Sequence, residues 1–147
     1  MFFDQMKTIS ICLLLIAQIF VACSKSRPAA AAVIRVTVGN PPTPHTNTGI
    51  GEIFTSYAVM RHTSQTLGLA KLWDVSEAEA DNRLRRAIKL VPGSEPGLLE
   101  FEAHGLDHEI AVKILEELCT YPGTLGIKVA EGGAEQEVQI SIVQPAK

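Results

Sequence analysis

The sequence has little of the material from which most recognisable ligand sites are built. Aromatic residues make up only 5% of the 147 residues, so we expect few exposed rings on which sugars or nucleobases could stack. There are 13 lysine and arginine residues against 16 aspartate and glutamate residues, which gives a formal net charge of −3. Because nucleic-acid binding draws on a strong excess of positive charge, we expect no nucleic-acid partner.

Cysteine is scarce as well. Cys12 and Cys23 lie in the N-terminal segment, so Cys119 has no cysteine near it in the rest of the chain. This excludes the disulfide framework that stabilises many small exported domains. Cys119 follows Leu118 on an apolar helix face, and we expect it to be a small buried hydrophobe rather than a reactive thiol.

Two histidines suggest a metal site, because His104 and His108 are four residues apart with Asp107 between them. Asp107 directly precedes an apolar helical stripe, however, which predicts that its carboxylate caps that helix. His104 would then lie in the preceding turn and His108 in the first helical position, on no shared helix face. A zinc site also needs further ligands, and no Cys/His pair elsewhere supplies them. We therefore expect neither a metal nor another cofactor.

Catalytic residues are equally hard to assemble. No serine, histidine and aspartate can be placed around a nucleophile turn, and the two carboxylates Glu100 and Glu102 alternate outward on an expected strand. We therefore expect a protein that is not an enzyme. The arginine cluster, Arg83, Arg85 and Arg86, is a possible site for an anion or a partner, although such charges more commonly form a solvated helix face.

The N-terminal segment predicts export. Residues 1–22 hold a lysine, Lys7, and then an apolar run from Ile9 to Ala22 that is shorter than the roughly 20 residues a spanning helix needs. The run ends at Cys23, in a context that resembles the lipobox where bacterial lipoproteins are cleaved and acylated. Two alternatives stay open: an uncleaved anchor and ordinary signal cleavage. All three place the domain outside the cytoplasm.

The remaining chain divides into a small-residue linker over residues 23–32 and one domain over residues 33–147. We expect a strand at 33–38, a loop at 40–51, and a helix from Glu52 to Leu69 that is broken near His62. A capping box at Ser76 begins the next helix, and strands follow on either side of the turn at 92–97. After the helix capped by Asp107, a hairpin with its turn at 131–134 ends the pattern.

This order of elements predicts an α+β fold. We expect a small mixed β-sheet of about four to five strands packed against three or so α-helices, behind the N-terminal signal helix.

Taken in this order, the exported part resembles the periplasmic base domain of the Wzz, or chain-length-determinant, family of polysaccharide co-polymerases. AAVIRVTV is similar to that family's first strand, and the helical stretch containing Leu67-Gly68-Leu69 is followed by Trp73, as in the family. The strand Leu98-Leu99-Glu100-Phe101 resembles its "LIEI"-like strand. Asp107, Ala111 and Ile114 match its D-x-x-x-A-x-x-I helix, and VQISIVQPA is similar to its final strand. The chain departs from the family in having no second membrane helix and no long coiled-coil arm.

The resemblance implies an interaction module of the cell envelope. It would lie on the periplasmic side and assist the biosynthesis or export of a surface polysaccharide, either as a homo-oligomer or by joining a membrane polysaccharide co-polymerase or polymerase. The lipobox-like context of Cys23 adds that lipid on this residue would hold the module to the inner or outer membrane. The alternative from another class is a free-standing lipoprotein that binds an anionic glycan, or another ligand, through the arginine cluster or the His104/His108 corner.

Overall fold

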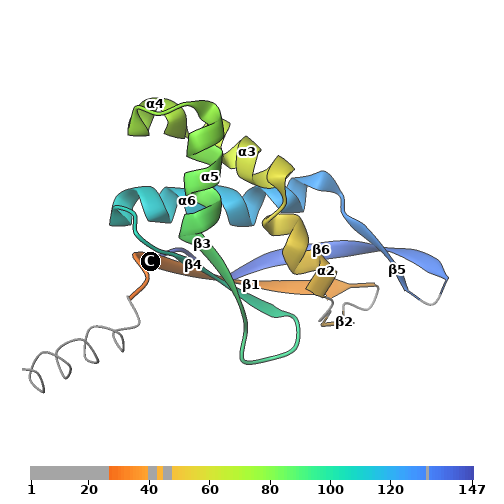
Figure 1. The fold of residues 1–147 in the computed structure, drawn as a ribbon. Coiled ribbons are helices and arrows are strands. Elements are labelled where there is room, and N and C mark those ends of the chain that lie inside the picture. The colour runs from red at the N-terminus through yellow and green to blue at the C-terminus, as the bar shows by residue number, and fades with distance from the viewer. Residues whose placement is uncertain (1–26, 40–42, 45–47, 132) are drawn as a thin grey trace, which may run out of the picture.

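A computed structural model of the protein describes residues 27–39, 43–44, 48–131 and 133–147. The predicted signal segment, residues 1–22, and Cys23 lie outside this part of the chain. The described residues form an α+β fold in which the helices lie on one face of a β-sheet (Figure 1). The α+β class predicted from the sequence is thus confirmed. No helix within the described ranges is long and apolar enough to cross a bilayer.

The sheet has the strand order β3-β4-β1-β6-β5, and a short strand β2 also pairs with β1. Every pairing is antiparallel, whereas we expected a mixed sheet. The reason is the hairpin formed by β3 and β4. It inserts β4 beside β1, so that β3, which runs in the same direction as β1, never becomes its neighbour. The strands are β1 (Ala30–Val38), β2 (Thr43–Pro44), β3 (Ile88–Pro92), β4 (Leu98–Ala103), β5 (Lys128–Glu131) and β6 (Ala134–Gln144).

The central strand begins earlier than predicted. Ala30, Ala31 and Ala32 were expected to be part of the linker but are the first three residues of β1. Ala30 and Ala32 are buried where the long helix α6 (His108–Thr120) crosses β1. Alanine offers little strand propensity of its own, so tertiary packing decides the conformation here.

The helical region after the loop is divided into three helices: α2 (Thr48–Phe54), α3 (Tyr57–Thr66) and α4 (Leu69–Trp73). The predicted break near His62 was wrong, because His62 lies inside α3 and the break falls at Thr55 and Ser56. Ser56 has an extended backbone, and its side chain accepts a bond from the Val59 N–H at 3.4 Å. A residue that caps a new helix in this way ends the preceding one. Gly68 separates α3 from α4 in the left-handed conformation, at φ 62°.

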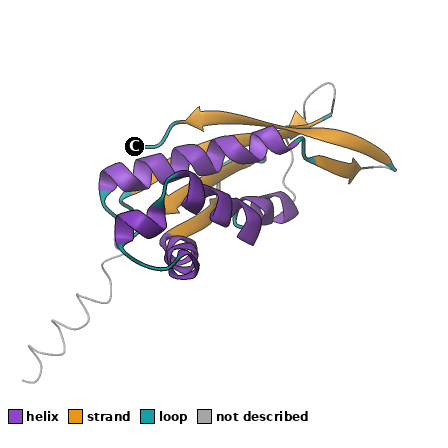
Figure 2. Ribbon diagram, turned by 90° about the horizontal axis from the view of Figure 1, so that it is seen from above, coloured by secondary structure: helices purple, strands orange, loops and turns teal. Residues whose placement is uncertain are grey.

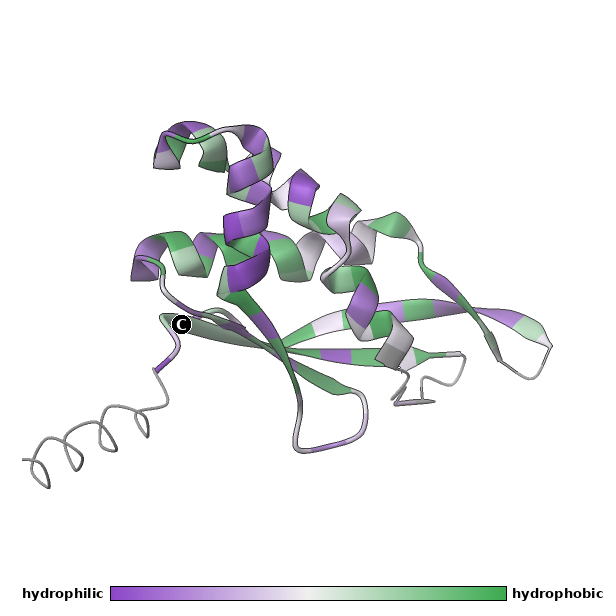
Figure 3. Ribbon diagram, viewed as in Figure 1, coloured by the Kyte–Doolittle hydropathy of each residue, from purple (hydrophilic) through white to green (hydrophobic). Residues whose placement is uncertain are grey.

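The predicted cap of the next helix, α5 (Glu77–Ala87), is confirmed. The Ser76 hydroxyl accepts a bond from the Glu79 N–H at 3.2 Å. Ala80, Leu84 and Ala87 form the inward stripe of α5 and are buried, as is Ile88, which begins β3. The rest of α5 is strongly hydrophilic, as Figure 3 shows. Together these features make α5 an outer helix that contacts its neighbours along one stripe.

The core lies between the helices and the inner face of the sheet. Ile34, Val36 and Val38 of β1 point into it, together with Phe101 of β4, whose ring lies 5.2 Å from that of Phe54. Seen from above, α6 runs along the sheet (Figure 2), where it packs on β1 and β4. The buried residues of α6 that face the core are Ala111, Ile114, Leu115, Leu118 and Cys119. A short 3-10 helix, Tyr121–Leu125, then leads to the C-terminal hairpin of β5 and β6, which was predicted at this position.

Candidate functional site

The two histidines that suggested a metal site have different partners. His104 Nε2 lies 2.8 Å from Glu102 Oε2 at the end of β4, while His108 Nδ1 lies 2.7 Å from the backbone carbonyl of Ala29. His108 therefore binds the residue that precedes β1 and fixes the start of α6 against that strand. Within the described ranges, no group of three or more histidine, cysteine, aspartate or glutamate residues is placed to hold a metal ion.

Asp107 between them caps α6, as predicted. Its Oδ1 accepts bonds from the backbone N–H groups of Glu109 at 3.0 Å and Ile110 at 3.4 Å. These are two of the amide groups that the first turn of a helix leaves without a partner, and a carboxylate there also interacts favourably with the helix dipole. The corner at residues 104–108 is thus held by local structural contacts.

The arginine cluster is divided among three environments. The Arg83 guanidinium lies over the Trp73 ring, 4.5 Å from its centroid, and so ties α5 to α4. Arg86 forms an ion pair with Glu79 at 2.9 Å. Arg85 is exposed. The structure does not bring the three guanidinium groups together around one position, because two of them are engaged within the helical layer.

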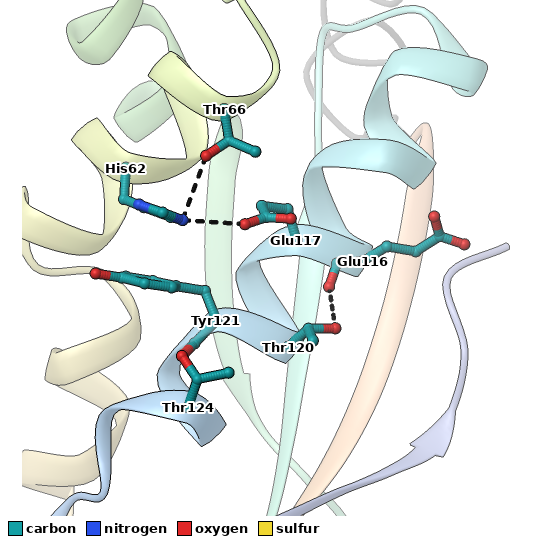
Figure 4. A network of polar contacts seen from close by, with 7 residues as sticks. All are labelled: His62, Thr66, Glu116, Glu117, Thr120, Tyr121 and Thr124. Carbon is teal, nitrogen blue, oxygen red and sulfur yellow. Dashed lines mark hydrogen bonds and ion pairs between the residues drawn. The ribbon is translucent and has the colours of Figure 1, made fainter.

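A polar cluster between α3 and α6 was not predicted from the sequence. His62 Nε2 lies 3.2 Å from Glu117 Oε1 and 3.3 Å from Thr66 Oγ1, and its ring stacks on Tyr121 with the ring centroids 3.5 Å apart (Figure 4). The spacing of four residues in both the His62/Thr66 pair and the Glu117/Tyr121 pair puts each pair on one helix face. That periodicity was the available signal, but only the fold shows that the two faces meet. The cluster joins α3 to α6.

A shallow groove lies between α4 and the start of α6. Its volume is about 400 Å³, within the range of small-molecule sites. Three leucines and Ile110 form its apolar lining, while its charged groups are two carboxylates and one lysine. This acidic balance does not suit an anionic ligand. The lining residues are Leu67, Leu69, Leu72, Asp107, Glu109, Ile110 and Lys113.

The outer edge of β6 is a further candidate site. β5 pairs with β6 only from Ala134 to Glu137, and one more bond joins the Val138 N–H to the Ile127 carbonyl at 2.8 Å. Beyond Val138, no described strand lies along this edge of β6, which follows the margin of the molecule in Figure 2. Ile142 and Val143 are each 49% exposed there. An open strand edge with apolar side chains is a template for pairing with another strand.

Comparisons with known proteins identify no relative of this chain, so a functional argument depends on the sites described above. No protein-family model matches this sequence, and neither the curated proteins nor the solved structures give a significant match to it.

Proposed function

We propose that the protein is an extracytoplasmic, lipid-anchored interaction module that assists surface-polysaccharide biosynthesis or export by associating with itself or with a membrane co-polymerase or polymerase. The predicted signal segment and Cys23 support the anchoring. The resemblance of the ordered elements to the base domain of chain-length determinants supports the setting. The observation that carries the interaction role is the open outer edge of β6, with Ile142 and Val143 half exposed along it.

A role in association fits this structure better than catalysis does. His62 and His104 are both paired with carboxylates, and His108 binds a backbone carbonyl. The His62 and His108 contacts join separate elements of the fold, and the His104 contact is local to the end of β4, so each of the three imidazoles already has a structural partner. The β6 edge, in contrast, presents backbone and apolar groups that gain partners only when another chain arrives.

Binding of an anionic glycan at the arginine cluster is the alternative. Arg83 and Arg86 are held by Trp73 and Glu79, so a glycan would have to displace those contacts or rely on Arg85. The separated guanidinium groups therefore favour the interaction role over the glycan-binding role.

The full chain with a C-terminal tag, purified from membranes in mild detergent, tests the proposal. We expect its mass to rise with concentration, or a membrane component of polysaccharide assembly to co-purify with it. A protein that stays monomeric at all concentrations and brings no such component would overturn the proposal. A melting temperature that rises with added anionic glycan, and does so less in an Arg85→Ala variant, would support the alternative.

A further inference from the structure

The direction of the backbone groups along β6 shows which of them are available to a partner. In an antiparallel ladder, successive residues direct their N–H and C=O groups alternately to one neighbour and to the other. The Val36 N–H binds the Gly97 carbonyl at 2.7 Å, on the β4 side. Val36 is opposite Ile140, so Ile140 does not exchange ladder bonds with β1.

The same direction follows independently from the other side of β6. The Val138 N–H points outward, to the Ile127 carbonyl. By alternation, the N–H and C=O groups of Ile140 and Ile142 also point outward, while those of Gln139 and Ser141 point to Thr37 and Arg35 of β1. The open edge thus offers two successive donor and acceptor pairs.

The side chains along this edge do not protect it from pairing. Natural sheets commonly block an edge with lysine, proline or a very short strand. The edge strand β3 carries Lys89 and ends at Pro92, and the four-residue strand β5 begins at Lys128. From Val138 to Gln144, VQISIVQ, the β6 edge has no charged residue and no proline. Such an edge is suited to a specific partner strand.

The charges on either side of the neutral stretch indicate which partner fits. Glu135 and Glu137 precede it and Lys147 follows it. When two identical strands pair antiparallel about a twofold axis at Ser141, the lysine end of each strand lies beside the acidic end of the other. Two parallel strands would instead place like charges together. An edge of this kind is complementary to itself, as a twofold interface requires.

We propose that the partner of this edge is a second copy of the chain. The two β6 strands pair antiparallel over residues 139–143, centred on Ser141. Ile140 of each copy exchanges backbone bonds with Ile142 of the other, and the two sheets become one continuous sheet. This inference rests on the proposed function and narrows it, because it names the partner and the residues that bind it.

Hydrogen exchange of the full chain in detergent micelles, measured residue by residue over a range of protein concentrations, tests the pairing. We expect the amides of Ile140 and Ile142 to become protected as concentration rises, in step with a doubling of the protein mass. The amides of Gln139 and Ser141 are the internal control, because their bonds to β1 protect them at every concentration. Amides of Ile140 and Ile142 that exchange at the same rate at all concentrations would overturn the inference.

A pair of variants provides a second test. Ile142→Lys places two like charges near the twofold axis, and we expect it to raise the dimer dissociation constant by about tenfold or more. Leu72→Lys makes the same change at a comparably exposed leucine on α4, 55% exposed against 49%, and should leave the constant unchanged. Equal weakening by both variants would contradict the β6 interface. A monomeric chain that still captures a membrane component of polysaccharide assembly would refute this inference alone, and the proposed function would stand.

Discussion

At the scale of single residues, the polar side chains that stand out in the sequence have structural roles. Asp107, His104 and His108 lie close together in the chain, yet each binds a different element: the first turn of α6, the end of β4 and the residue before β1. Clustering in sequence is therefore a poor guide to a site here. What matters is the direction in which each short segment turns its side chains.

The cap of α6 can be tested by replacing Asp107 with alanine. We expect the free energy of unfolding to fall by about 1 kcal/mol, because two amide groups of the first turn lose their acceptor. Chemical denaturation of the full chain measures the difference. Asp107→Asn is the matched control and should retain most of the stability, since asparagine is as good a cap. A loss as large in the asparagine variant as in the alanine variant would show that capping is not the cause.

Cys119 gives a pH dependence. Burial raises the pKa of its thiol from 9.0 to about 12. Below pH 9 the folded and unfolded states both keep the proton, so the thiol adds no pH dependence to the free energy of unfolding there. Between 9 and 12 the unfolded state releases it first, and the free energy of unfolding falls as pH rises, by at most about 1.4 kcal/mol per pH unit.

Denaturation at a series of alkaline pH values measures this slope in the natural chain and in Cys119→Ala. Other groups that titrate in this range act equally on both proteins, so we expect the variant to lose stability less steeply with pH. Parallel curves for the two proteins would mean that Cys119 is ionised in the folded state as easily as in the unfolded state.

At the scale of elements, the turn between β3 and β4 brings Gly97 close to the backbone of β1. Gly97 has φ 79°, and a Cβ there would lie 2.9 Å from the Val36 carbonyl oxygen. Gly97→Ala should therefore destabilise the protein by about 1 to 3 kcal/mol. Gly123→Ala is the matched control, because nothing lies within 4 Å of its added Cβ. Thermal unfolding of the two variants should separate clearly, and similar melting temperatures would contradict the role given to Gly97.

The sequence predicted the elements with strong local signals. The caps at Ser76 and Asp107, the apolar stripe of α6 and the C-terminal hairpin all follow from periodicity and from side chains that bind nearby backbone. The division of α2 from α3 was missed because Thr63 and Ser64, although polar, are buried inside α3. Polar residues next to His62 suggested a break there, whereas Ser56 carried the actual helix start.

The parts that could not be predicted depend on contacts between distant residues. Ala30 and Ala32 belong to β1 because α6 covers them, and no local preference of alanine announces a strand. The cluster of His62, Glu117 and Tyr121 exists only because α3 and α6 lie side by side. The open edge of β6 has the same origin, since periodicity shows that a strand exists but not which of its edges is paired.

At the scale of the whole molecule, the proposed anchor can be tested at Cys23. We expect Cys23→Ala to abolish incorporation of labelled fatty acid and to move the chain from the membrane fraction to the soluble fraction. Cys12→Ala is the control and should change neither result. A Cys23→Ala protein that remains fully membrane-bound would show that lipid on Cys23 is not the anchor, and would favour an uncleaved N-terminal segment.

The meeting of residues 31 and 147 has a mechanical consequence. The Ala31 N–H binds the Lys147 carbonyl and the Lys147 N–H binds the Ala31 carbonyl, both at 3.2 Å. The start of β1 and the residues after β6 therefore leave the sheet at the same corner. Tension applied between them would unzip the central ladder one hydrogen bond at a time instead of shearing all of its bonds together. Such a domain would open under low force if it were pulled between a membrane tether and a cargo attached after Lys147.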